Sequence, residues 1–145
     1  MSVIRKATPM DTQRILELYK ELTDEAQNAP GETIDRVFAE IVAMPNQEFL
    51  VAEKDGVVVG TLFLQIIPNL SHQARPWAIL ENMIVDSRYR RQGIGRLLIE
   101  YATNRCREAG CYKVQLLSNK KRQEAHQFYR SMRFEDSALG FRLYL

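Results

Sequence analysis

The sequence predicts an α/β (α+β) fold: a mixed central sheet with helices on both faces, in the order β-α-α-β-β-β-α-β-α-β. Strand-like and helix-like apolar patterns interleave along the chain, which favours such a layered arrangement. The turn Lys54-Asp55-Gly56 joins two apolar runs as an antiparallel hairpin. A helical pattern over 94–106 lies between two strand-like runs, and such a crossover makes those two strands parallel. The 145 residues are expected to form a single domain, 1–145.

The first third of the chain predicts one strand and two helices. Residues 3–7 form the strand, and Thr8-Pro9-Met10-Asp11 starts a helix because it combines a cap, a first-turn proline and an acidic residue. The apolar residues that follow at helical spacing are Ile15, Leu18, Tyr19, Leu22 and Ala26. Residues 28–31 break this helix. The second helix carries Ile34, Val37, Phe38 and Ile41, and it ends at Pro45-Asn46.

The rest of the chain predicts five strands and two helices. The strands are expected over 49–52, 57–67, 77–85, 113–118 and 141–145, with a polar loop over 69–76. The helix after the 77–85 strand has an apolar face made of Ile94, Leu97, Leu98, Tyr101, Ala102 and Cys106. Gly110 stops that helix. The last helix presents Ala125, Phe128, Tyr129 and Met132 on one face.

Composition places the chain among globular proteins and argues against several function classes. The net charge is only +2, which gives no global case for binding nucleic acid. No run approaches the roughly 20 apolar residues of a membrane span, and the N-terminus lacks the apolar stretch of a signal peptide. Cys106 and Cys111 suit a reducing compartment, so we expect a cytoplasmic protein in which they pack as small apolar residues. We expect no metal site, because the two cysteines lie on unrelated elements and the chain has only two histidines.

A basic, glycine-containing loop follows the 77–85 strand and opens the next helix. It is neither a dinucleotide fingerprint, because Leu98 stands where the third glycine belongs, nor a P-loop, because no G-K-[ST] triplet occurs. What remains is R-x-x-G-x-G at Arg90, Gly93 and Gly95. A helix start has unpaired N–H groups and a partial positive charge, so with a glycine turn and arginines around it the stretch predicts a phosphate site. A basic surface turn is the alternative explanation.

This context resembles the GNAT superfamily of acyl-CoA-dependent N-acetyltransferases. Their central signature is a strand ending in Val, a short basic loop and R-x-x-G-x-G, matched here by residues 79–98. A second signature is matched by Asn119, Ala125, Phe128-Tyr129 and Arg133-Phe134, where Arg133 departs from the usual glycine. Within the family, the strings 120–129 and 141–143 look most like small-molecule enzymes such as the aminoalkylphosphonate acetyltransferases.

The resemblance implies acetyl-CoA as cosubstrate and assigns residues to it. The pyrophosphate falls to the loop and helix start, and Arg90 either buttresses the loop or touches phosphate. These residues are Arg90, Arg91, Gln92, Gly93, Ile94, Gly95 and Arg96. The pantetheine arm is expected where two strands splay apart, between Met83, Ile84 and Val85 on one side and Leu117-Ser118 on the other. Asn119 is expected to bind the same arm, with a strand-end turn as its alternative role. Lys120-Lys121-Arg122 is either a solvated helix start or a further contact to the ribose phosphate.

Two residues are candidates for the chemistry. Tyr129 matches the family tyrosine that protonates the leaving thiolate, and its alternative role is a packed aromatic residue. Glu81 is the candidate base. By the strand period of two it is expected on the face of Met83 and Val85. In such apolar surroundings a carboxylate either has a raised pKa or is connected to the substrate amine by a chain of water molecules. A structural, hydrogen-bonded carboxylate is the alternative. The backbone N–H of Ile84 or Val85 is expected to stabilise the oxyanion.

The predicted function is acetyl transfer from acetyl-CoA to a primary amine, without an acyl-enzyme. A small-molecule amine is the first choice of acceptor and a peptide or protein amine the second. A non-catalytic acyl-CoA sensor and a nucleic-acid domain built on the arginine cluster are the rival classes. His72 could contact the acceptor or handle a proton, and His126 could shape the substrate end, although a surface helix position is the favoured explanation for His126. A homodimer is possible because exposed terminal strands pair readily.

Overall fold

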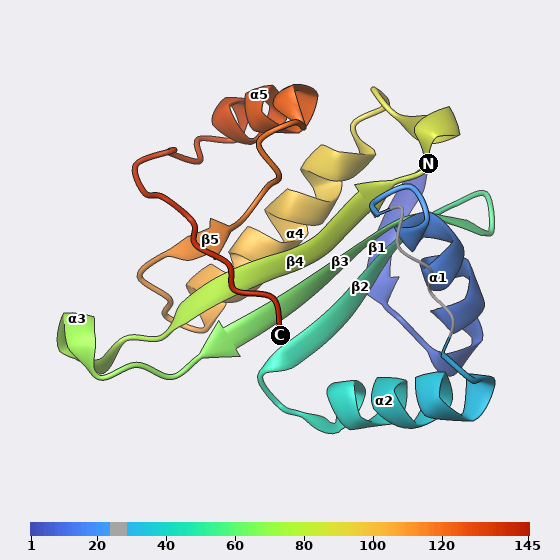
Figure 1. Ribbon diagram of the computed structural model, residues 1–145, viewed down its shortest axis with the longest axis horizontal. Helices are drawn as coiled ribbons and strands as arrows, with labels where there is room; N and C mark the ends of the chain where they lie inside the picture. Colours follow the sequence, from blue (N-terminus) through green and yellow to red (C-terminus); the bar gives the residue numbers. More distant parts are fainter. Residues whose placement is uncertain (24–28) are drawn as a thin grey trace.

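The computed structural model describes residues 1–23 and 29–145 and contains a five-stranded sheet in the order β1-β2-β3-β4-β5. Neighbouring strands are antiparallel except for β4 and β5, which are parallel. The strands are β1 (Ser2–Lys6), β2 (Gln47–Lys54), β3 (Val57–Ile67), β4 (Trp77–Val85) and β5 (Val114–Leu116). The predicted mixed α/β sheet is therefore confirmed (Figure 1).

Local sequence explains the two connections that set this topology. Asp55 and Gly56 both have positive φ, 52° and 78°, which is the conformation that a two-residue hairpin turn between β2 and β3 requires. The helix α4 (Ile94–Glu108) carries the chain from the end of β4 back to the start of β5. Gly110, at φ 81°, follows its C-terminus and allows the reversal.

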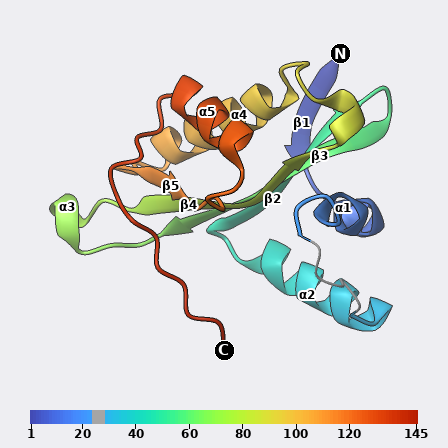
Figure 2. The same ribbon diagram turned by 45° about the horizontal axis from the view of Figure 1, so that its top comes forward.

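Helices cover both faces of the sheet, as predicted (Figure 2). On one face α4 buries Ile94, Leu98, Ile99, Ala102 and Cys106 against the strands, and α5 (Gln123–Ser131) packs partly buried side chains on the same cluster. On the other face α1 (Thr12–Tyr19) buries Ile15 and Leu18, and α2 (Gly31–Ala43) buries Phe38. Short turns complete the chain at η1 (Pro9–Asp11), α3 (Ser71–Ala74) and η2 (Ser87–Tyr89). None of the helices in the described part of the chain is long and apolar enough to cross a membrane.

Several predicted elements differ from the structure. The last strand, 141–145, is wrong: these residues form no strand, and Phe141 is 88% exposed. Figure 2 shows that the chain passes from the α5 face to the face of α1 and α2 without a neighbouring strand to pair with. An alternating apolar pattern makes a strand only where a sheet edge accepts its hydrogen bonds.

The other differences are local. The first helix ends at Tyr19 rather than including Leu22, and Ala26 with Asn28 lies outside the described residues. Gly31 begins α2 instead of breaking a helix. Within the predicted loop 69–76, α3 is a single turn whose residues 72–74 have positive φ. Leu97 is 39% exposed while Ile99, which was not expected in the core, is buried, because the sheet-facing side of α4 is centred on Leu98.

A buried carboxylate holds the end of β4. Asp86 is 2% exposed, and its side chain accepts hydrogen bonds from the backbone N–H of Arg88 at 2.9 Å and from the guanidinium groups of Arg88 and Arg14. These bonds, chiefly those from Arg88, hold the pKa of Asp86 well below its usual range despite the opposing effect of burial. The backbone N–H of Asp86 donates to Val59, so one residue ties together β3, α1 and the turn after β4.

We predict that Asp86→Asn lowers the free energy of unfolding by about 2 kcal/mol at neutral pH, because two guanidinium groups lose their anion. The native pKa lies below the unfolded value of 3.8, so the carboxylate stabilises the fold above that value and this stabilisation is lost as the pH falls below it. Urea unfolding at pH 7 and at acidic pH measures both effects. The control is Asp136→Asn, which removes the exposed pair with Arg130. Equal losses in the two variants would contradict this role for Asp86.

Candidate active site

A groove of about 840 Å³ opens between the end of β4, the loop before α4, the first turn of α4, and α5. It gathers residues that are far apart in sequence. Those predicted residues that line it are Met83, Ile84, Val85, Arg90, Arg91, Gly93, Ile94, Gly95, Arg96 and Tyr129. Lys121 and Arg122 line it as well, whereas Lys120 is not among the lining residues.

The two strands that flank the groove separate at its floor. The register of β4 with β5 runs from Ala78 opposite Val114 to Leu80 opposite Leu116 and goes no further, although β4 continues to Val85. The last residues of β4 therefore pair with β3 on one side and face the groove on the other. This is the splay that the family resemblance implied, and it leaves backbone polar groups beside the groove.

The two glycines of the loop, Gly93 and Gly95, are needed for different structural reasons. Gly93 has φ 82° and precedes the first residue of α4, so the chain turns into the helix through a left-handed conformation. Gly95 lies in the first turn, where a Cβ would stand 3.2 Å from Met83 Cε and 3.3 Å from Phe128 Cζ. A glycine thus lets the start of α4 lie close to β4 and α5. The first N–H groups of the helix have no acceptor within it, so this end favours an anion.

The arginines around the loop divide into two groups. Arg88 binds Asp86, and Arg90 donates from Nε to the carbonyl of Val85 at 3.1 Å and pairs with Glu21 at 3.6 Å. Arg90 therefore buttresses the loop, which is one of its two predicted roles. Arg91 and Arg96 make only longer, exposed pairs, with Glu124 at 4.0 Å and Glu100 at 3.6 Å. Exposed pairs of this kind are weak and leave both guanidinium groups able to meet an anionic ligand.

Four residues expected at the coenzyme do not line the groove: Gln92, Leu117, Ser118 and Asn119. The Gln92 side chain accepts a hydrogen bond from Lys54. The Asn119 side chain accepts from the backbone N–H of Lys121 at 2.9 Å, which is an Asx turn at the start of the α5 segment. His126 lies close to the carbonyl of Asn119, at 2.8 Å. The alternative role given to Asn119, a turn residue, is the one that this geometry favours.

Tyr129 stands at the groove and in the core at once. Its ring packs edge-on against Phe128 and Phe134, with centroids 5.4 and 5.8 Å away. Its hydroxyl points at Met83 Sδ at 3.9 Å, and burial raises the pKa of the phenol. A phenol with a raised pKa keeps its proton at neutral pH, as a proton donor requires. Both proposed roles, packing and donation, are compatible with this position.

Glu81 lies on the other face of the sheet, contrary to the prediction. Between the pairs Phe63–Glu81 and Thr61–Ile84, a single residue of β3 is opposite two residues of β4, and Asn82 has φ 52°. This β-bulge moves Met83 and Val85 to the α4 face and leaves Glu81 on the face of α1 and α2. A strict period of two fails at a bulge. Glu81 is also exposed, so the apolar surroundings expected for it are absent.

Sequence reasoning missed one buried hydroxyl group close to this bulge, that of Tyr19; a second buried hydroxyl belongs to Ser118, which was already expected beside the pantetheine arm. Tyr19 Oη and Ser118 Oγ are buried and have no hydrogen-bond partner among the described residues. Burial raises the pKa of Tyr19, and the nearby Asn82 amide partly opposes this without completing a hydrogen bond. In sequence, Tyr19 is one more apolar position of a helix, and nothing there distinguishes it.

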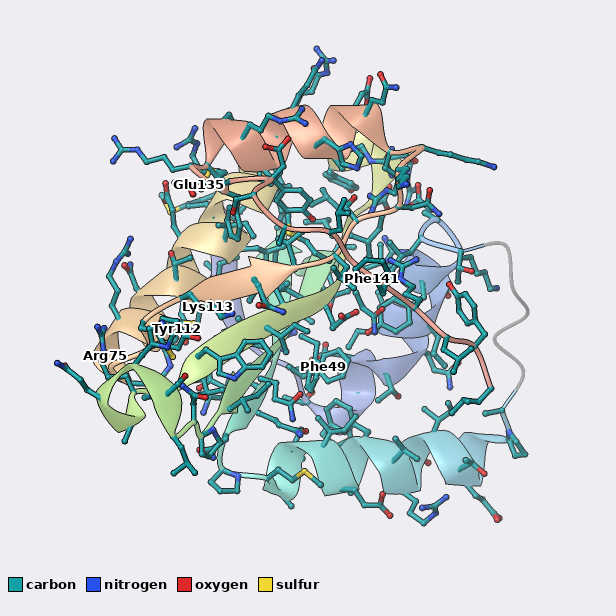
Figure 3. All side chains as sticks on the ribbon, turned by 60° about the vertical axis from the view of Figure 1, so that its left-hand side comes forward. Phe49, Arg75, Tyr112, Lys113, Glu135 and Phe141 are labelled. Atoms are coloured by element: carbon teal, nitrogen blue, oxygen red, sulfur yellow. The ribbon has the colours of Figure 1, made fainter. Side chains whose placement is uncertain are left out.

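The remaining candidates lie elsewhere. His72 stacks on Tyr112, with centroids 3.9 Å apart and planes 9° from parallel, at the start of β4 rather than at its groove end. Figure 3 shows Tyr112, Lys113 and Arg75 at this end of the sheet. Cys106 is buried and packs as an apolar residue, as predicted. Burial raises the pKa of its thiol to about 12, so the thiol stays neutral at physiological pH.

We predict that Gly93→Ala lowers the free energy of unfolding by about 1 kcal/mol, because an alanine at φ 82° is strained although open space surrounds its Cβ. Gly31→Ala is the matched control: its Cβ also meets nothing within 4 Å, but the residue starts a helix at ordinary φ. That variant is expected to be neutral or more stable. Chemical denaturation compares the two, and a loss of stability only in Gly31→Ala would contradict the assignment.

Comparisons with known proteins agree with this geometry. The sequence profile of the acetyltransferase (GNAT) family matches residues 13–134. An aminoalkylphosphonate N-acetyltransferase of Salmonella typhimurium is 30% identical over 138 residues, which are 95% of this chain and 88% of the relative. The structure of glucosamine-6-phosphate N-acetyltransferase from Arabidopsis thaliana superposes with a TM-score of 0.89 at 26% identity, over 99% of this chain and 98% of the other.

A predicted acetyltransferase from Clostridium acetobutylicum, whose structure contains acetyl-CoA, shares the fold with a TM-score of 0.78 at 20% identity, over 99% of this chain and 96% of that one. The profile match covers most of the chain, and the curated relative is similar over nearly its whole length. The protein therefore belongs to the acetyltransferase (GNAT) family and is an N-acetyltransferase.

Proposed function

We propose that this enzyme transfers an acetyl group from acetyl-CoA to a primary amine of a small molecule, by direct attack in a ternary complex. The observation that carries the proposal is the groove in which the α4 N-terminus, a left-handed glycine and five basic side chains meet the separated strands β4 and β5. The Clostridium structure with acetyl-CoA supports the same choice of cosubstrate.

The residues present fit acetyl-CoA. The N–H groups at Ile94, Gly95 and Arg96 would hold the pyrophosphate, with Arg91 beside them. Lys121 and Arg122, at the other wall, would meet the ribose phosphate. The pantetheine arm would lie along Met83, Ile84 and Val85, whose strand lacks β5 as a partner there. When bound, acetyl-CoA supplies a thioester carbonyl that an amine can attack.

The chain's own groups would manage the protons of this reaction. A typical alkyl amine is protonated at neutral pH, so it must lose a proton before it attacks. Glu81 is exposed on the sheet face of α1 and α2, and it would accept that proton through water from an amine bound there. The C–N bond forms, the C–S bond breaks, and Tyr129 Oη would give its proton to the leaving sulfur. The backbone N–H of Ile84 or Val85 would stabilise the oxyanion.

The names of the Salmonella and Arabidopsis relatives put aminoalkylphosphonates and glucosamine 6-phosphate among the amines to test. A peptide or protein amine is the alternative substrate, and a non-catalytic acyl-CoA-binding module is the alternative class. Tyr129, a candidate proton donor, and Glu81, a candidate base, lie on opposite sides of β4 near its bulge. The presence of both groups favours a catalytic protein over a non-catalytic binding module.

We predict that acetyl-CoA binds the wild-type enzyme with micromolar affinity in a calorimetric titration, and that thiol release then requires an amine. Initial rates should give intersecting patterns, since a ternary complex forms without an acyl-enzyme. Tyr129→Phe should keep the affinity for acetyl-CoA and lower kcat about a hundredfold. Tyr144→Phe, on the exposed terminal segment, should match wild type.

The contrary results separate the alternatives. Absence of acetyl-CoA binding to folded protein would overturn the proposal. Binding with no transfer to any small amine or peptide would identify a sensor module.

We further propose a homodimer and a cytoplasmic location. The terminal residues Leu139, Phe141, Leu143, Tyr144 and Leu145 are all exposed. An exposed apolar segment of this kind favours burial against another chain. The location is supported by Cys106 and Cys111, which are free thiols and suit a reducing compartment.

Removal of residues 139–145 tests the dimer. Sedimentation equilibrium should show a dimer for the full chain and a monomer for the shortened one. The segment is exposed, so its loss should leave the far-UV circular dichroism spectrum unchanged. A full chain that stays monomeric at high micromolar concentration would overturn the proposal.

A further inference from the structure

Three phenylalanines form a continuous strip on the sheet face that carries Glu81. Phe38 on α2 lies 5.9 Å from Phe49 on β2, and Phe49 lies 5.4 Å from Phe63 on β3, measured between ring centroids. Phe38 is buried, while Phe49 and Phe63 are half-buried and so retain accessible ring surface. Phe63 is the cross-strand partner of Glu81. The strip therefore ends at a carboxylate.

The strip has a carboxylate at its end, and the exposed Arg142 lies on the terminal segment that crosses the same face. Glu81 is exposed and has no ion pair among the described residues. Two basic residues of the surrounding elements are engaged with other groups. Lys113 lies over the rings of Trp77 and Tyr112 at the start of β4, and Arg36 on α2 pairs with Glu40 at 2.8 Å. Arg142 is exposed on the terminal segment, which crosses this face with Phe141 (Figure 3).

A polar group completes the arrangement at the bulge. Tyr19 on α1 packs against the buried cluster of the same face, which includes Val51 and Ile84, and its hydroxyl is buried without a partner among the residues described. Asn82, next to Glu81, approaches it. A buried hydroxyl is satisfied only when a ligand or another group reaches it. The position beside Glu81 is where an amine held by that carboxylate would present its N–H groups.

Resting on the proposed function, we propose that the acceptor is a primary amine carried on an aromatic body without a phosphate or phosphonate group, that is, an arylalkylamine. The ammonium group would meet Glu81 and the Tyr19 hydroxyl, and the aromatic body would lie on Phe63 and Phe49. Ring faces attract cations and stack on rings, whereas a phosphonate would meet the Glu81 charge with no sheet cation beside it.

Two amines with the same linker test this directly: 2-phenylethylamine and 2-aminoethylphosphonate, each assayed at saturating acetyl-CoA. We expect kcat/KM for the phenyl compound to exceed that for the phosphonate at least about tenfold. Phe63→Leu should lower kcat/KM for 2-phenylethylamine about tenfold through KM. The KM for acetyl-CoA, which binds on the other side of β4, should not move. Tyr19→Phe should likewise raise KM for the amine.

The outcomes are distinguishable from failure of the proposed function. Equal turnover of the two amines, or preference for the phosphonate, overturns the acceptor class while acetyl transfer stands. Preference for the phenyl compound that survives Phe63→Leu overturns the role of the strip. Removal of residues 139–145 that raises both activities equally identifies the terminal segment as occupant of the strip and also overturns it. Absence of acetyl-CoA binding overturns both proposals together.

Discussion

The last residues of β4 have a partner strand on one side only, and the rest of the site depends on this. Pairing with β5 stops at Leu80 and Leu116, yet β4 continues along β3 to Val85. The open side faces the groove, and α4 begins just beyond it. The buried Asp86 then fixes the turn that leads from the strand to the glycine loop. If β4 paired with β5 along its whole length, the floor of the groove would be closed.

The β4 bulge divides the chemistry between two faces of the sheet. Because Asn82 takes a left-handed conformation, Met83 and Val85 face α4 and Tyr129, whereas Glu81 faces α1 and α2. The groove thus lies on one side of the strand and Glu81 on the other. An amine bound near Glu81 would approach the thioester from across the strand. Asparagine tolerates the left-handed conformation better than most residues, so the bulge can form at Asn82 at low cost.

Sequence reasoning located the groove better than the opposite sheet face, for a physical reason. A glycine loop that opens a helix leaves a local signature, so the residues of 90–96 that line the groove, all except Gln92, could be identified from adjacent positions in the chain. The strip from Phe38 to Phe63 comes together only through strand register and packing of α2. Glu81 was placed on the wrong face because a single left-handed residue is invisible in an apolar pattern. Phe141 and its neighbours failed as a strand because no edge accepts them.

The central claim is that the start of α4 holds the pyrophosphate of acetyl-CoA. Backbone amide NMR of the full chain, followed during titration with acetyl-CoA, tests it most directly. The account predicts that the largest shifts fall on the N–H groups of Gly93, Ile94, Gly95 and Arg96, with smaller ones over Met83 to Val85. Saturable binding whose largest shifts fall instead at Trp77 and Lys113, at the opposite end of β4, would contradict it.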